Sequence, residues 1–373
     1  MNKDYLDYFE YFETPEFKTL FSRYQKMKEK GISEYFDADE LVDITEYYYN
    51  KGMKKEALTT LEFALKMHPD NIDVQLCQAR TCMNEGDYEQ VQQLLDSIID
   101  QTDREVLFLR AELNIIKKNI PQTSVYLNQI IPNEEEPIDI YQAYIDIGEL
   151  FLDYEEYERA AKYFIKAEKS AQICEDPQEL VWRAQADRAI CLFALGEHQK
   201  GIDLVNRILD EDPYSHTHWC LLGEFYVELE EFDKAMDAFD YALAIQQDYK
   251  EAIFWKACCY TYLENNTAAL KLFHQCIEKE YKLSETHFAC GVLYNTQMEF
   301  AKAIFHLKKS EELMNGTPRY AFELYTNLAD AYIQSRLYQQ AIHYIMLADP
   351  LSPGNEQIQN LYKQIEDKEE NIQ

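Results

Sequence analysis

The sequence predicts an all-α fold in which many copies of one amphipathic helix pair stack in a row. The 373 residues include only ten glycines and ten prolines, too few for a β-rich or loop-rich protein. Apolar residues recur three and four positions apart, which is the spacing of one helix face. This pattern itself recurs after about 34 residues, and such a period indicates a solenoid of stacked helix pairs.

Residues 216–249 carry the clearest copy of the pattern. Two short amphipathic helices lie on either side of a turn at Glu230 and Glu231. Large and small residues follow one another in a set order: Trp219, Leu222, Gly223, Tyr226, Phe232, Ala235, Phe239 and Ala242. One such pair cannot bury both of its faces, so it requires copies before and after it.

Similar copies divide the chain into three expected parts. Residues 38–355 form the repeat array, with copies that begin at residues 38, 72, 104, 141, 182, 216, 250, 284 and 322. The copy at 104–136 has lost most of its aromatic residues and matches the pattern least. The interval between the fourth and fifth copies is longer than the others, so we expect a change of superhelical pitch there.

Terminal helices are expected to cover the two ends of the array. In residues 1–37, Thr14, Pro15 and Gly31 mark the limits of a capping helix, preceded by an aromatic and acidic segment. Its apolar stripe consists of Phe17, Leu20, Phe21, Tyr24 and Met27. Residues 356–373 predict a polar helix that turns Ile358, Leu361 and Ile365 inward and solvates the last repeat.

The order Trp219, Leu222, Gly223, Tyr226, Ala235 and Phe239 resembles the signature of the tetratricopeptide repeat family. The resemblance covers roughly residues 38–355. It implies a right-handed superhelix of about nine antiparallel pairs. It also implies a concave groove, lined mainly by the first helix of each pair, that binds a peptide or protein segment. The lysines and asparagines with which some family members clamp a chaperone tail are absent from the matching positions.

Charge and composition exclude several classes of partner. A net charge of −32 disfavours nucleic acid and anionic membrane. The sequence has no secretory signal and no apolar run long enough to span a bilayer. The nine cysteines fall within helical segments, so we expect reduced thiols and a cytoplasmic location.

Acidic residues dominate the positions that the family geometry places in the groove, where Arg80 and Arg183 are the only basic residues. We therefore predict capture of a basic segment. The alternative is that the acids only solvate the first helices and suit the helix dipole. The acidic candidates for partner binding are Asp146, Glu149, Asp153, Asp187, Glu224 and Glu228.

Aromatic residues occupy the same positions in the seventh and eighth copies. They are Phe254, Trp255, Tyr262 and Phe288, and exposed aromatic residues often anchor a bound chain. The alternative is that these rings pack between repeats, as most aromatic residues of such arrays do.

No catalytic, cofactor or metal site is predicted. The sequence lacks a glycine-rich phosphate loop and a recognisable catalytic grouping. His216 and His218 lie at a repeat junction, where we read them as loop residues, and no cysteine or acid at ligand spacing completes a metal site.

The sequence thus indicates a non-catalytic scaffold for an unidentified protein or peptide. Two alternatives stay open. The aromatic N-terminal segment would join subunits in one of them. In the other, the chain is the regulatory subunit of an enzyme.

Overall fold

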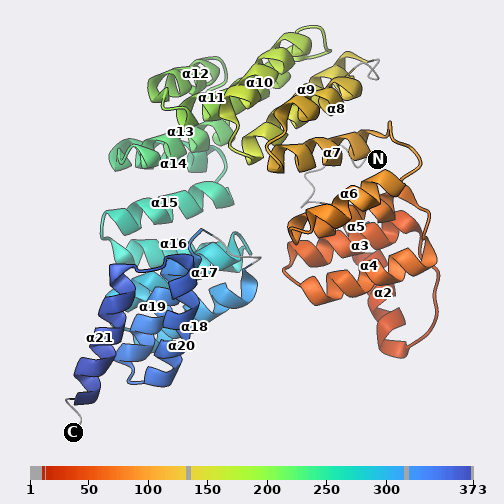
Figure 1. Ribbon diagram of the computed structural model, residues 1–373. Coiled ribbons are helices and arrows are strands. Elements are labelled where there is room, and N and C mark those ends of the chain that lie inside the picture. Colours follow the sequence, from red (N-terminus) through yellow and green to blue (C-terminus); the bar gives the residue numbers. More distant parts are fainter. Residues whose placement is uncertain (1–10, 13, 132–135, 315–318, 371–373) are drawn as a thin grey trace. The chain divides into compact units, whose positions relative to one another are not determined.

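The computed structural model describes residues 11–12, 14–131, 136–314 and 319–370, and every regular element in these ranges is helical (Figure 1). Most helices form antiparallel pairs, as predicted. The first helices are α3 (Ala38–Asn50), α5 (Ile72–Asn84), α7 (Arg104–Ile116), α9 (Pro137–Asp153), α11 (Pro177–Ala194), α13 (His216–Glu228), α15 (Lys250–Tyr262), α17 (Leu283–Thr296) and α19 (Ala321–Gln334).

The second helices complete the pairs. They are α4 (Lys54–Met67), α6 (Tyr88–Ser97), α8 (Ile120–Ile130), α10 (Tyr157–Ala171), α12 (His198–Glu211), α14 (Phe232–Ile245), α16 (Asn266–Glu278), α18 (Phe300–Leu313) and α20 (Tyr338–Ala348). Pairs form even over residues 72–130, where the sequence pattern is weakest. Packing of each pair on its neighbours therefore compensates for the missing aromatic residues. None of the described helices is long and apolar enough to cross a membrane.

The turn within each pair has one recurring backbone feature. The second residue after each first helix has a positive φ angle. This angle is 70° at Gly52 in the first pair and 59° at Arg336 in the last. Left-handed residues of this kind end helices by satisfying the last carbonyl groups. Glycine fills the position in three pairs, whereas larger residues such as Glu230 and Met298 fill it in others.

A close approach between a small and a large residue holds the two helices of a pair together. A Cβ atom placed on Gly223 of α13 would lie 2.5 Å from a ring carbon of Phe239 on α14. The same distance separates such an atom on Gly148 from the ring of Phe164 on α10. The ring therefore rests directly on the backbone of the first helix, which explains the glycine in the signature.

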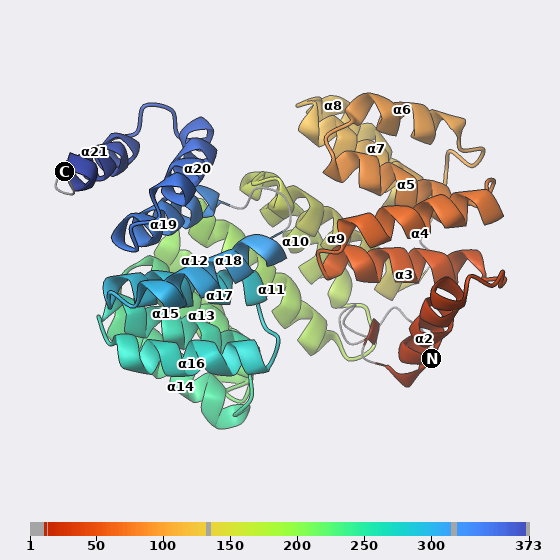
Figure 2. The same cartoon turned by 90° about the horizontal axis from the view of Figure 1, so that it is seen from below.

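A helix precedes the pairs and another follows them. The N-terminal helix α2 spans Pro15–Lys30; the Thr14 hydroxyl accepts a hydrogen bond from Phe17 N, and Gly31 ends it with φ of 61°. The C-terminal helix α21 (Glu356–Glu370) packs on α19 and α20, beside which it lies in both views (Figures 1 and 2). The inward residues of α21 are Ile358, Leu361 and Ile365, which are all buried.

The chain divides into two compact units, Met1–Gln178 and Glu179–Gln373. The division falls inside α11, between the fourth and fifth sequence copies, where the repeat interval is longest. Within each unit, first helices of successive pairs contact one another, for example α3 with α5 and α13 with α15. Second helices also contact the first helix of the next pair, as α4 does with α5 and α14 does with α15. The first helices thus adjoin one another on one side of the stacked pairs, which we call the first-helix face.

The contact between Gly223 and Phe239 leads to a first prediction. Gly223→Ala should lower the free energy of unfolding by about 1–3 kcal/mol because the added methyl group overpacks the pair. A solvent-exposed helical position would instead gain up to about 1 kcal/mol from the same change. Thermal melting followed by circular dichroism measures the difference.

A double-mutant cycle supplies the control for this prediction. Gly223→Ala combined with Phe239→Ala should cost less than the two single changes together, because the smaller side chain leaves room for the methyl group. Strict additivity, or a higher melting temperature for Gly223→Ala, would contradict the close approach.

Candidate functional site

Seven polar and aromatic side chains from three successive pairs gather on the first-helix face of the C-terminal unit. Cys220 and Glu224 lie on α13, and Tyr249, Glu251 and Trp255 lie at the start of α15 or within it. Tyr281 and Lys282 precede α17. We call these seven residues the Glu224 cluster. Because α13 contacts α15, the cluster lies across the seam between successive pairs.

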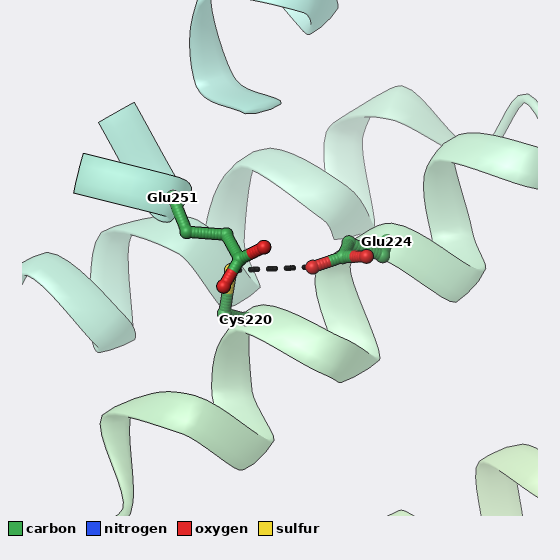
Figure 3. A group of neighbouring side chains, drawn as sticks. All are labelled: Cys220, Glu224 and Glu251. Carbon is green, nitrogen blue, oxygen red and sulfur yellow. Dashed lines mark hydrogen bonds between the residues drawn. The ribbon is translucent and has the colours of Figure 1, made fainter. Parts of the chain in front are cut away.

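Two carboxylates and a thiol meet at the centre of the Glu224 cluster (Figure 3). Cys220 Sγ and Glu224 Oε1 lie 3.6 Å apart and share a hydrogen bond. Glu251 reaches across from α15, so that ligand atoms of all three residues lie within 4.8 Å of one another. Cys220 is buried, and both glutamates are partly buried.

Hydroxyl groups and one ammonium group compensate the charge of Glu251. Tyr249 donates a hydrogen bond of 2.9 Å to Glu251 Oε2, and the Tyr281 hydroxyl lies close enough to this carboxylate for Glu251 to raise the pKa of Tyr281. Lys282 Nζ lies 3.9 Å from Glu251 Oε1. Two hydroxyl groups and one ammonium group thus surround the Glu251 carboxylate.

Glu224 has weaker compensation than Glu251. Burial, and secondarily the charge of Glu251, raise the pKa of Glu224 to about 7. Lys282, the Cys220 thiol and the Trp255 indole offset this rise only in part. The buried indole N–H of Trp255 has no hydrogen-bond acceptor in good geometry, although it lies near enough to lower the pKa of Glu224. Burial and the same two acids also raise the pKa of the Cys220 thiol.

Aromatic rings surround the Lys282 ammonium. Its Nζ lies 5.2 Å from the ring centre of Phe254, 5.6 Å from that of Trp255 and 5.5 Å from that of Tyr281. These distances are within the range of cation–π attraction.

Known families and structures identify the scaffold that carries the cluster. The tetratricopeptide repeat pattern matches residues 52–113, 145–216, 219–249 and 322–355, together more than half of the chain. The chain belongs to the tetratricopeptide repeat family. Cys220, Glu224 and Tyr249 of the cluster lie within the third of these matches, and its other four residues lie beyond the end of that match. No curated protein matches the sequence at a significant level.

Solved structures show the same fold. The APC/C hetero-tetramer Cut9–Hcn1 aligns over 89% of this chain and 64% of its own chain, with 17% sequence identity and a TM-score of 0.54. PilF of Pseudomonas aeruginosa aligns over 62% of this chain and 100% of its own, with 14% identity and a TM-score of 0.52. At such identities the likeness concerns the fold alone.

The six acidic candidates fall in different units and surroundings. Asp146, Glu149 and Asp153 lie on α9 of the N-terminal unit, where Asp146 pairs with Arg104 at 2.6 Å. Asp187, Glu224 and Glu228 lie on first helices of the C-terminal unit. Of these candidates, only Glu224 enters the cluster described above. Glu228 is exposed one turn further along α13.

The four aromatic candidates also have different surroundings. Phe254 is only 8% exposed and packs on Phe273, whereas Trp255 is partly buried. Tyr262 is 64% exposed and stacks on Phe232 at 5.0 Å. Phe288 stacks on Tyr320 at 4.8 Å. Trp255 belongs to the Glu224 cluster and Phe254 lies beside it, next to Lys282, while Tyr262 and Phe288 stack on other partners.

Sequence analysis did not single out Cys220, Tyr249, Tyr281 and Lys282. A partial signal existed, because Cys220 and Glu224 are four residues apart on one helix and must share a face. The two tyrosines and Lys282 lie at the ends of their copies, and only the packing of three pairs brings them to Glu224.

Among the described residues, Cys220, Glu224 and Glu251 are the one group of three metal-ligating side chains within 4.8 Å. Buried His287 and His306 make a close pair, with Nδ1 atoms 2.9 Å apart, and burial lowers the pKa of His306 to about 4. The loop assignment of His216 and His218 was wrong. Both lie in the first turn of α13, because the helix begins at His216.

The raised pKa of Glu224 predicts a specific pH dependence of stability. Between about pH 4 and pH 7 the folded protein holds a proton that the unfolded chain has released, so stability falls as pH rises through this window. Glu224→Gln removes this loss, which amounts to at most about 3 kcal/mol. The gain in melting temperature from Glu224→Gln should therefore be larger at about pH 8 than at about pH 5.

Calorimetry at both pH values tests this prediction, with Glu228→Gln as the control. Glu228 is exposed on the same helix, so its substitution should have an effect that varies little with pH. A gain from Glu224→Gln that is equal at both pH values would contradict the buried, proton-binding carboxyl.

Proposed function

We propose that this protein is a non-catalytic protein-interaction scaffold whose C-terminal unit binds a basic segment of a partner protein on its first-helix face. The observation that carries the proposal is the poorly compensated Glu224 beside Glu251. Exposed acids extend this surface, with Glu228 on α13 and Glu285 on α17. A cationic partner supplies positive charge beyond the partial compensation that Lys282 gives to Glu224.

Basic residues of the second helices are engaged locally, which supports this assignment. Lys200 pairs with Glu197 at 2.7 Å, and Lys234 pairs with Glu231 at 2.5 Å. In both cases the acid is the residue immediately before the second helix. Lys200 and Lys234 are therefore paired at the start of their own helices rather than with acids of the first-helix face.

Two acids on first helices of the N-terminal unit have arginine partners, in contrast to Glu224. Arg80 pairs with Glu105, and Arg104 pairs with Asp146. A cleft of about 410 Å³ lies between α3 and α5, but Arg80 lines it together with Glu46. The C-terminal unit is therefore the better site for a basic ligand.

The thiols support a non-catalytic role. All nine cysteines are free, and seven of them are buried. Burial is the largest cause that raises the pKa of Cys77, Cys191 and Cys290 to about 12. Because the thiolate is the reactive form, these cysteines are poor nucleophiles.

A peptide of alternating lysine and serine tests the proposed function. It should bind with an affinity that falls as salt concentration rises, because opposite charges attract less at higher ionic strength. Glu228→Lys with Glu285→Lys should weaken binding about tenfold, or roughly 1.4 kcal/mol. Fluorescence anisotropy of the labelled peptide measures both effects.

Asp233→Lys with Asp237→Lys is the matched control, because both exposed residues lie on the second helix α14. The net charge changes equally in the two double variants. Equal loss of binding in both would indicate attraction to the overall charge, and salt-independent binding would contradict the proposal.

Self-association through the N-terminal segment gains no support from the residues that are described there. Residues 1–10, which hold most of this segment, lie outside the described ranges. Tyr11 donates a 2.6 Å hydrogen bond to Asp43, and Phe12 is buried against Phe17. Both residues thus make contacts within the N-terminal part of the same chain.

Truncation tests the self-association alternative. Removal of residues 1–10 should leave the molar mass by light scattering unchanged, since Tyr11 and Phe12 remain to cover α2. Conversion of a dimer to a monomer would favour subunit joining instead.

A further inference from the structure

The surroundings of Lys282 form a box suited to an organic cation. The rings of Phe254, Trp255 and Tyr281 lie 5.2–5.6 Å from its ammonium nitrogen. Glu251 closes one side, with an oxygen 3.9 Å from the same nitrogen. Several aromatic faces with one carboxylate are the arrangement that recognises ammonium groups. We call Phe254, Trp255, Tyr281, Glu224 and Glu251 the cation box.

The cation box contains two carboxylates, those of Glu224 and Glu251, but Lys282 supplies only one positive charge. The Lys282 ammonium lies 3.9 Å from Glu251, while Glu224 shares a 3.6 Å hydrogen bond with the neutral Cys220 thiol and is offset only in part by Lys282 and Trp255. The box is also open to solvent on the lysine side, since the side chains of Lys282 and Glu251 are 37% and 35% exposed. An incoming side chain can therefore reach the rings if the lysine moves out.

The backbone that presents Lys282 has a conformation that is uncommon for a residue with a side chain. Lys282 has φ of 41° and ψ of 51°, and Glu280 before it also has a positive φ. The preceding junction, between α14 and α15, has no residue with positive φ. Non-glycine residues adopt this conformation at an energetic cost, so the position of the lysine is maintained against local preference.

We propose that the cation box is a subsite for one lysine side chain of the partner and that Lys282 is an internal occupant displaced by it. This inference rests on the proposed function and specifies how a basic segment is recognised. Lys282 lowers the affinity of the box for other cations, because an incoming ammonium must first replace it. The free energy that favours displacement of Lys282 comes from the other contacts that the partner makes with acidic residues of the first-helix face.

The same geometry favours an organic cation over a metal ion. A divalent ion between Cys220, Glu224 and Glu251 would make no use of the three aromatic rings beside them. A thiol also prefers softer metals than two carboxylates do. The three rings, in contrast, are what an ammonium with an aliphatic stem requires.

The test empties the box in two independent variants of the full chain. Lys282→Met keeps an unbranched side chain without charge, and Lys282→Gly suits the positive φ angle and so guards against a folding defect. The probe is Nα-acetyl-lysine methylamide, and its Nε-acetylated form is the neutral control. The indole N–H signal of Trp255, assigned with Trp255→Phe, reports binding by nuclear magnetic resonance.

Both emptied variants should bind the lysine probe at least tenfold more tightly than the unaltered protein, with a saturable shift of the Trp255 signal. The acetylated probe should have no such effect. Adding Glu251→Gln to Lys282→Gly should reverse most of the gain. Lys279→Met is the matched control, because Lys279 lies in the same junction but pairs with Asp248 at 2.8 Å. It should behave as the unaltered protein does.

Three results would overturn the inference. They are an unchanged affinity in both emptied variants, an equal gain in Lys279→Met, and binding that does not move the Trp255 signal. Tight zinc binding to the unaltered protein, abolished by Cys220→Ser, would assign the box to a metal instead.

The peptide of lysine and serine separates this inference from the proposed function. If the peptide binds through Glu228 and Glu285 while the emptied variants gain nothing, the scaffold function stands and the box is not a lysine subsite. If the lysine probe binds the emptied box but the peptide binds no form of the protein, the proposed function alone fails.

Discussion

The contact of a large side chain with the backbone of its partner helix is the constraint on which the rest of the structure depends. Phe239 lies on Gly223 so closely that a single methyl group has no room. Phe164 on Gly148 and Leu307 on Gly291 repeat the arrangement. Each contact sets the separation of two antiparallel helices, and pairs of equal separation can stack in a regular row. First helices of successive pairs then meet on one face of each unit.

This stacking also creates the electrostatics of the candidate site. Glu224 is on the exposed side of its own pair, and only the next pair covers it. Once α15 packs against α13, Glu251 and Trp255 surround the carboxyl, and its pKa rises to about 7. A scaffold of identical pairs can thus carry a chemically distinct site wherever the residues at one seam depart from the usual pattern.

Much of the fold could be predicted from the sequence because its determinants are local. The capping signals at Thr14 and Gly31 and the inward stripe of α21 involve residues within a few turns of one another. The weakest copy, at residues 104–136, shows the limit of such prediction. Its helices form without most aromatic residues because neighbouring pairs supply the burial. His216 and His218 were misplaced because a junction between repeats has no local signal for where the next helix begins.

The candidate site could be predicted only in part. Glu224, Phe254 and Trp255 were identified from their positions in the repeat, but the pattern treated Tyr262 and Phe288 as equivalent to them. The structure gives each of these two rings a separate partner, Phe232 and Tyr320. Repeat position determines which face a residue occupies, whereas its exposure depends on the side chains of the next pair.

The sequence by itself determined the helix pairs, their period, the capping helices and the acidic character of the first helices. These properties follow from spacing along one chain segment, where helical geometry relates position to face directly. Only the tertiary structure decided that Cys220, Glu224, Glu251 and Lys282 share one site. They come from three pairs, and their distances depend on how those pairs stack. Burial and charge pairing arise from that stacking, so the spacing of residues along the sequence cannot predict them.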